Sequence, residues 1–228
     1  MIQLVSDKKS DSSLTLRTLG LEARGHREIT VDFDDAALAT EAAIFLIFIA
    51  DYLETTGNQI QSGETMAYGY WLVKFEAIET DALEVWEYDD ETIDFAKGAS
   101  LTLRYWKDQH AICEKYGAAF EPPRPDRLTV ISPGVLEGLP VYGVRYPSPS
   151  HMSGWWITTD QYDGNISNLT HEHTYHITAA RPELAPYLAL PYRYRFDLSA
   201  GKSVWFDEKI EADDSDESDD TDKGQPNR

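Results

Sequence analysis

Cysteine and methionine are scarce in this 228-residue sequence, which contains one cysteine, Cys113, and three methionines. A single thiol cannot form an internal disulfide or a zinc site built from several cysteines. The absence of a disulfide framework fits a reducing compartment, so we expect a cytoplasmic protein. Residues 1–13 contain no apolar run of signal-peptide length.

Long apolar runs and basic residues are also lacking. The most apolar window, residues 42–50, is far shorter than the ~20 residues that a membrane-spanning helix needs. Lys and Arg together number 20 against 40 Asp and Glu, which gives a net charge of −20. Residues 207–228 hold ten of these acids and three bases, so the rest of the chain keeps −13. Such a chain repels nucleic acid and membrane surfaces and attracts basic partners, unless its acidity only maintains solubility.

The common catalytic motifs are missing. There is no Gly-x-Ser-x-Gly sequence, because Ser153 precedes Gly154 but follows Met152. Neither glycine-rich phosphate-binding motif occurs. We therefore predict no catalytic residue, no cofactor and no metal, and our first expectation is a protein that is not an enzyme.

The most informative stretch that is present is residues 151–163, HMSGWWITTDQYD. Gly154 permits a bend before a predicted strand, in which Trp155 and Ile157 alternate with Trp156 and Thr158. One tryptophan is thus predicted to anchor a core and the other to lie on a working surface.

Further aromatic strands follow in residues 188–196, LALPYRYRF, and residues 204–208, VWFDE. The order of SGW, RPELAPYLALP, RF and WFD resembles the immunity-protein domain of bacterial polymorphic toxin systems, in the thirty-third numbered family of such proteins. The resemblance covers residues 127–210. It implies a protein that binds a cognate toxin and blocks it without chemistry. The family usually has glycine where this chain has Arg193, so the bend after Pro191 can differ from that of the family.

The first half is predicted to pair strands with two main helices. A strand is expected through Ile29, Val31 and Phe33, followed by a helix over residues 36–55 that begins at Asp34-Asp35. That helix is apolar nearly all round, so we expect it to be buried. Strands over residues 65–75 and 83–88 and a helix over residues 100–116 follow.

The complete prediction is an α+β fold with mostly antiparallel sheets, two main helices in the N-terminal half, and a small aromatic-rich sheet with one short helix in the C-terminal half. The predicted division is a mobile N-terminus (1–19), an N-terminal domain of unknown role (20–118), a proline-rich seam (119–126), an immunity-protein-like domain (127–210) and a disordered acidic tail (211–228).

A histidine cluster, His171, His173 and His176, suggests an alternative function as a metal-assisted hydrolase. Two of the imidazoles could meet a metal in either a strand or a helix, and a third ligand would have to come from elsewhere, with Asp160 and Asp163 as candidates. Surface or hydrogen-bonding histidines are the simpler interpretation. A regulatory or scaffold module is a further alternative.

A partner-binding surface is the preferred interpretation of the same region. Aromatic anchors in a charged rim are typical of binding hot spots, and carboxylates at the rim suit a basic partner. The predicted partner is a toxin protein with a basic surface, with no nucleic acid and no membrane involved, and the oligomeric state is left open. The predicted contact residues are Trp156, Asp160, Tyr162, Asp163, Glu172 and Tyr175.

Overall fold

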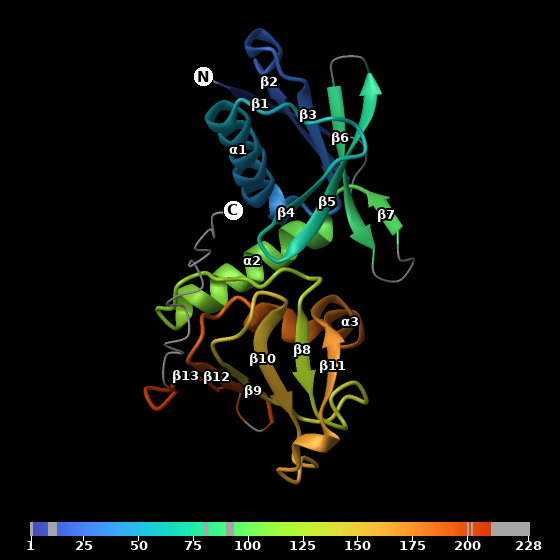
Figure 1. The fold of residues 1–228 in the computed structure, drawn as a ribbon. Helices are drawn as coiled ribbons and strands as arrows, with labels where there is room; N and C mark the ends of the chain where they lie inside the picture. The colour runs from blue at the N-terminus through green and yellow to red at the C-terminus, as the bar shows by residue number, and fades with distance from the viewer. Residues whose placement is uncertain are drawn as a thin grey trace, which may run out of the picture.

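Two β-sheets, one in each half of the chain, make up the computed structural model of this protein, with helix α2 between them (Figure 1). The structure describes residues 2–8, 13–79, 82–89, 94–199, 201 and 203–210. The predicted disordered tail, residues 211–228, lies outside the described residues.

The strands are β1 Gln3–Lys8, β2 Leu14–Leu19, β3 Glu28–Phe33, β4 Thr65–Tyr68, β5 Trp71–Glu79, β6 Ala82–Asp89, β7 Asp94–Lys97, β8 Leu128–Ile131, β9 Tyr142–Arg145, β10 Met152–Thr158, β11 Thr170–His173, β12 Tyr194–Asp197 and β13 Ser203–Phe206. The α-helices are α1 Ala39–Thr56, α2 Ser100–Lys115 and α3 Thr174–Ala180. Short 3-10 helices are η1 Glu22–Arg24, η2 Ala36–Leu38, η3 Ile166–Asn168 and η4 Pro182–Tyr187.

The first sheet has seven strands in the order β1-β2-β3-β6-β5-β4, with β7 paired to β6. Its β3–β6 pair is parallel and its other described pairs are antiparallel. Apolar side chains of β3, among them Ile29, Val31 and Phe33, alternate toward α1 and are buried, as the sequence pattern predicts.

Strands β1 and β2 occupy residues where the sequence indicated no regular element. Leu4, Leu14 and Leu16 pack against the first core, which accounts for pairing in so polar a segment. The single strand predicted over residues 65–75 is two strands, because the chain turns at Gly69, whose φ is 55°.

Helix α1 begins and ends as expected but is not buried all round. The Asp35 side chain accepts a hydrogen bond from the Ala37 amide at 2.8 Å, and Gly57 ends the helix with a φ of 67°. Ile44, Ile47 and Phe48 remain exposed, because the sheet covers only one side of the helix. The prediction of a fully buried helix is therefore wrong.

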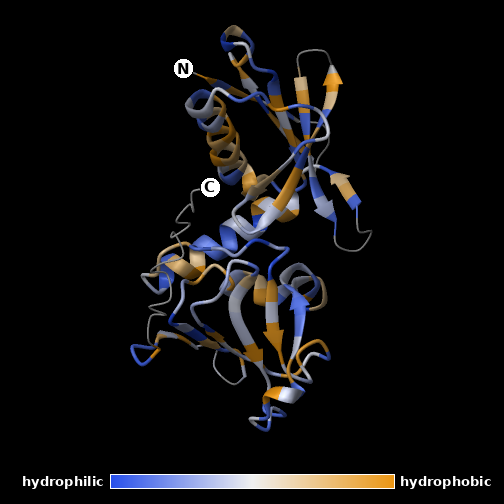
Figure 2. Cartoon of the chain, in the orientation of Figure 1, coloured by the Kyte–Doolittle hydropathy of each residue, from blue (hydrophilic) through white to orange (hydrophobic). Residues whose placement is uncertain are grey.

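The expectation that the apolar stretch is too short to span a membrane does not hold for the whole helical segment. By length and composition alone, residues Ala36–Thr56 are long and apolar enough to cross a membrane, with a mean hydropathy of 1.8 over the most apolar window. Figure 2 shows the apolar character along α1. The face turned to the sheet, which includes Phe45, Ile49 and Leu53, is part of the first core.

The second sheet has six strands in the order β11-β8-β10-β9-β12-β13, and its β8–β10 pair is parallel. One face is the core of this half: Trp155, Ile157, Phe196 and Val204 are buried there against η4 and its surroundings. The Trp155 indole N–H donates to the Leu188 carbonyl at 3.0 Å. Trp155 is thus the core anchor that the sequence alternation predicts.

Helix α2 joins the two halves. Leu103 contributes to the first core, while Tyr105 and Cys113 contribute to the second. Its first turn is capped from β6: the Glu87 carboxylate accepts hydrogen bonds from the amides of Leu101 (3.0 Å) and Thr102 (2.6 Å). The second predicted main helix therefore belongs to the junction as much as to the first half.

Aromatic side chains fill the junction beside α2. The Tyr70 and Thr178 hydroxyls share a buried hydrogen bond of 2.9 Å between the halves. The Tyr88 ring meets the Tyr175 ring edge-on at 5.7 Å, and the Trp71 indole donates to the Tyr88 carbonyl at 2.8 Å. The α+β prediction is confirmed in general, but each sheet contains one parallel pair and the second sheet is nearly as large as the first.

The bend after Pro191 keeps the backbone conformation that glycine favours. Arg193 has a φ of 71°, the one positive φ of a non-glycine residue in the described part of the chain. Its side chain stabilises the strained position, because Nε donates to the Ile210 carbonyl at 2.7 Å and the guanidinium lies 5.4 Å from the Phe206 ring centre. Arg193 therefore holds the bend in a glycine-like conformation and adds contacts to the final segment.

Candidate partner-binding surface

The face of the second sheet that points away from its core is the candidate site. Strand register places six residues in one row across it, and residues paired in register share a face. The row, from one edge to the other, is His171, Val130, Trp156, Val144, Arg195 and Trp205. With strands ~4.8 Å apart, the row is about 24 Å long. We call this side of the sheet the outer face.

Aromatic side chains are exposed on the outer face. Tyr142 and Trp205 are 40% and 43% exposed, and Trp156 is half-buried, with its ring 5.9 Å from that of Tyr146. Tyrosine and tryptophan combine a large apolar area with a polar group, which suits them to sites that alternate between water and a partner. The outer face therefore offers rigid anchors for a macromolecule.

A groove of about 450 Å³ lies at one side of this face. Tyr146, Arg195, Asp207, Lys209 and Ile210 line it. The Arg195 Nε donates to the Asp207 carboxylate at 2.6 Å. The Lys209 backbone amide, followed by the Arg195 side chain, lowers the pKa of Asp207. The carboxylate and the guanidinium are thus held as a fixed pair beside the aromatic surface.

The predicted site residues in the loop after β10 lie at the end of the sheet remote from the first half (Figure 1). Asp160 and Asp163 are exposed, and Tyr162 is half-buried. The Asp163 carboxylate accepts hydrogen bonds from the Asn165 amide at 2.9 Å and from the Asn168 side chain at 3.1 Å. Asp163 thus shapes the loop itself.

The other two predicted residues lie at the opposite end of β11. Glu172 is half-buried, and its Oε2 lies 3.4 Å from Nδ1 of His176. Tyr175, at the start of α3, packs against Tyr88 and the second core. The structure therefore does not bring the six residues into one patch: Trp156 is on the outer face, and Tyr175 is in the junction between the halves.

The three histidines contact aromatic and acidic neighbours. His173 stacks on Tyr175 with 5.4 Å between ring centres, and its ring centre is 5.6 Å from that of His176. His171 follows the outer-face row, away from the Glu172–His176 pair. Among the described residues, no group of three or more His, Cys, Asp or Glu is arranged to hold a metal ion.

Two buried polar groups in the second half are used in packing. Burial raises the pKa of the Cys113 thiol to about 11, and the thiol lies 3.7 Å from the Ala189 carbonyl oxygen. Burial also lowers the pKa of Arg145 to about 10. Arg145 donates to the carbonyls of Glu121 at 2.5 Å and Leu190 at 2.6 Å, which ties the proline-rich segment to the sheet.

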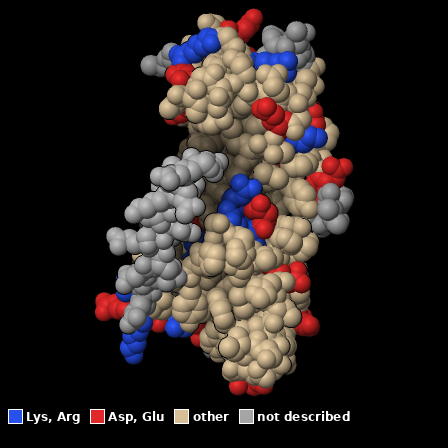
Figure 3. Space-filling view, in the orientation of Figure 1, with Lys and Arg blue, Asp and Glu red and all other residues tan. Residues whose placement is uncertain are grey.

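The acid excess is concentrated outside the second sheet. Residues 127–210 contain eight acids and seven bases, whereas residues 1–126 contain 24 acids and 11 bases. On the face shown in Figure 3, basic and acidic side chains are interspersed. The long-range attraction expected for a basic partner therefore comes mainly from the first half, whereas residues 127–210 are nearly neutral as a whole.

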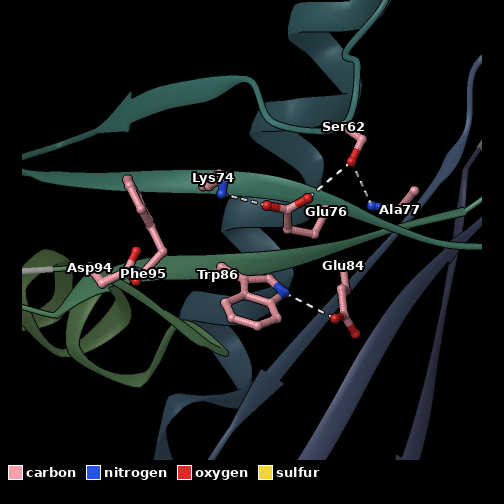
Figure 4. A network of polar contacts seen from close by, with 8 residues as sticks. All are labelled: Ser62, Lys74, Glu76, Ala77, Glu84, Trp86, Asp94 and Phe95. Carbon is pink, nitrogen blue, oxygen red and sulfur yellow. Dashed lines mark hydrogen bonds and ion pairs between the residues drawn. The ribbon is translucent and has the colours of Figure 1, made fainter. Parts of the chain in front are cut away.

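The side of the first sheet that points away from its core carries polar side chains that pair with one another, unlike the outer face of the second sheet. Figure 4 shows Glu76 between Lys74, at 2.5 Å, and the Ser62 hydroxyl, at 3.0 Å. On the neighbouring strand the Trp86 indole donates to Glu84 at 2.9 Å, and Lys97 also pairs with Glu84. These contacts satisfy the charges within the sheet, so this face is the weaker candidate for binding.

Tyr142, Tyr146 and Trp205 were not predicted as site residues. The alternation in residues 142–146, YGVRY, is a sequence signal that places Tyr142, Val144 and Tyr146 on one side of a strand. Only the strand order shows that this side continues that of Trp156.

No curated protein and no solved structure matches this chain. A protein-family model matches part of the chain. The match begins inside α2 and ends just after β13, so it includes all strands of the second sheet and covers less than half of the chain. Residues 108–207 match the family model of the Imm33-like domain, which confirms the resemblance of the C-terminal part to an immunity-protein domain of polymorphic toxin systems.

Proposed function

We propose that this protein neutralises a cognate bacterial toxin by direct, non-catalytic binding through the outer face of its second sheet. The match of residues 108–207 to the Imm33-like domain supports an immunity-type function. The observation that carries the choice of surface is the row of register-paired residues that ends in the exposed Trp205.

The chemistry of the outer face supports a protein partner. Exposed tyrosine and tryptophan are enriched among the residues that dominate binding energy. The groove beside them, with its Arg195–Asp207 pair, can receive a polar side chain of the partner. Blocking by occupation requires no chemical step, which agrees with a family of non-enzymatic immunity proteins.

The partner is a toxin protein, and the basic surface predicted for it now depends on the acid excess of residues 1–126. Nucleic acid and anionic membranes are disfavoured by the same charge. We place the interaction in the cytoplasm, where one unpaired cysteine, Cys113, stays reduced. Fractionation of cells that express the native chain tests this location.

The test of function is co-expression with the toxin encoded beside this protein. We expect growth to be rescued, and a catalytically inactive toxin domain to bind the purified chain in calorimetry. Trp205→Ala and Tyr142→Ala should each weaken the affinity by about 10- to 100-fold. Ile78→Ser is the matched control, because Ile78 is equally exposed but lies on β5 of the first sheet.

Two results would contradict the proposal. One is unrescued growth while both proteins remain soluble. The other is turnover of a substrate by the purified chain, together with bound metal that is lost on His171→Ala or His173→Ala. That second result would favour the hydrolase alternative.

A further inference from the structure

The exposed side of α1 is a second candidate binding surface. It lies in the half of the chain that the family match does not cover. Thr40, Ile44, Ile47 and Phe48 follow helical spacing along this side and are all exposed, and Asp51 continues the line. Ile47 is 51% exposed. Contiguous apolar side chains at the surface of a soluble domain mark interaction sites more often than scattered ones do.

A groove of about 390 Å³ borders this helical stripe. Its apolar lining comes from Leu4 of β1 with the preceding Ile2, and from Ile47 and Ala50 on α1. Its polar lining comes from Arg24, Asp51 and Glu54. The Arg24 guanidinium pairs with the Glu54 carboxylate. Asp51 is exposed at the end of the groove, next to the apolar residues. The groove can thus receive an apolar side chain with a positive charge nearby.

The surrounding charge favours a basic occupant. Residues 1–126 have 24 acids and 11 bases, and exposed acids lie at both ends of the helix, with Asp34 and Asp35 before it and Asp51 and Glu54 near its end. A second copy of this chain would bring like charges together on the same stripe. An anionic membrane surface would be repelled for the same reason.

We infer that the exposed side of α1 and its groove form a second docking surface, which binds a basic amphipathic segment of a partner protein. Apolar side chains of that segment would cover Ile44, Ile47 and Phe48, and one of them would enter the groove. A Lys or Arg of the segment would pair with Asp51. Helix-in-groove recognition of this kind places apolar anchors at positions i, i+3, i+4 and i+7.

The inference does not depend on the proposed function, and the two fail separately. The probe is a fluorescein-labelled helical peptide of leucine and lysine with leucine at those positions, titrated with the full chain in an anisotropy assay. A leucine and glutamate peptide of the same pattern is its control. We expect saturable binding of the basic peptide that weakens as salt is added, and about tenfold weaker binding of the acidic peptide.

Single substitutions assign the binding to α1. Ile47→Ser and Asp51→Asn should each weaken binding of the basic peptide by about tenfold, and Asp51→Asn should also reduce its salt dependence. Ile166→Ser and Glu137→Gln are matched controls on exposed residues of the second half and should leave binding unchanged.

Several outcomes would overturn the inference. One is equal binding of the acidic and basic peptides, and another is the absence of saturable binding. Sedimentation equilibrium that finds a dimer dissociated by Ile47→Ser would assign the surface to a second copy. Cosedimentation with phosphatidylcholine vesicles that is abolished by Ile47→Ser would assign it to a lipid surface.

Discussion

Gly143 offers a direct test of which side of the second sheet is its core. It lies on β9 opposite Phe196 of β12, and a Cβ atom added to it would be 2.2 Å from the Phe196 ring. Real side chains do not approach so closely, and both residues are in strands that form the inner face. Gly143→Ala therefore forces either the ring or the strand to move.

The magnitude follows from packing. Overfilling a well-packed core costs about 1–3 kcal/mol, and replacing glycine in a strand returns about 0.5–1 kcal/mol through the unfolded state. Because an approach of 2.2 Å calls for the upper end of the packing cost, we expect Gly143→Ala to lose about 2 kcal/mol of unfolding free energy. Phe196 is fully buried against Trp155 and Tyr187, so Phe196→Leu alone should lose about 1–2 kcal/mol.

The double variant separates a steric clash from general damage. Leucine leaves room for the new methyl group, so we expect the double variant to lose at least 1 kcal/mol less than the sum of the two single losses. Urea unfolding followed by circular dichroism measures all three losses. Gly201→Ala is the control, because no atom of the described residues lies within 4 Å of its added Cβ.

Additive losses, or a Gly143→Ala variant as stable as the unaltered protein, would contradict a clash between residue 143 and Phe196. Gly143 would then not face Phe196. Since strand alternation places Val144 and Trp156 opposite to Gly143, the outer face would lose its basis as well.

Three further predictions concern other parts of the fold. Glu87→Ala should lose about 2–3 kcal/mol in urea unfolding, because the Thr102 amide loses its acceptor at the start of α2. Burial raises the pKa of Glu87, so the unfolding free energy of the unaltered protein should fall as pH rises from 4.5 through the raised pKa. Glu87→Gln should remove this dependence of stability on pH. A steeper pH dependence in that variant would contradict burial of Glu87 as the cause. Arg193→Gly should be about 1 kcal/mol more stable than Arg193→Ala in the same assay, since only glycine tolerates a φ of 71° without strain, and equal stabilities would argue against strain there. Cys113, with a pKa of about 11, should resist a thiol reagent at pH 8 in the folded protein and react rapidly in urea, whereas fast labelling of the folded protein would mean that the thiol is accessible.

Local patterns were sufficient for much of the secondary structure. The Asp35 cap, the helix over residues 36–55 and the alternation that buries Trp155 all depend on neighbours within a few positions, and the structure confirms them. The strands in residues 3–19 were missed because the segment contains many polar residues. They are stabilised by pairing of β1 with β2 and of β2 with β3, and by packing against the first core.

For the candidate site, too, local sequence patterns predicted some features and missed those that depend on contacts between distant segments. Sequence alone is enough to predict that Trp155 and Trp156 point to opposite sides of a strand, that acids outnumber bases, and that residues 127–210 resemble an immunity-protein domain. The three-dimensional fold was needed to show that Trp205 joins Trp156 on one face, that Tyr175 is in the junction, and that one side of α1 stays exposed. The physical reason is that periodicity specifies how a strand or helix divides its own side chains, whereas strand order and packing specify which of those sides meet.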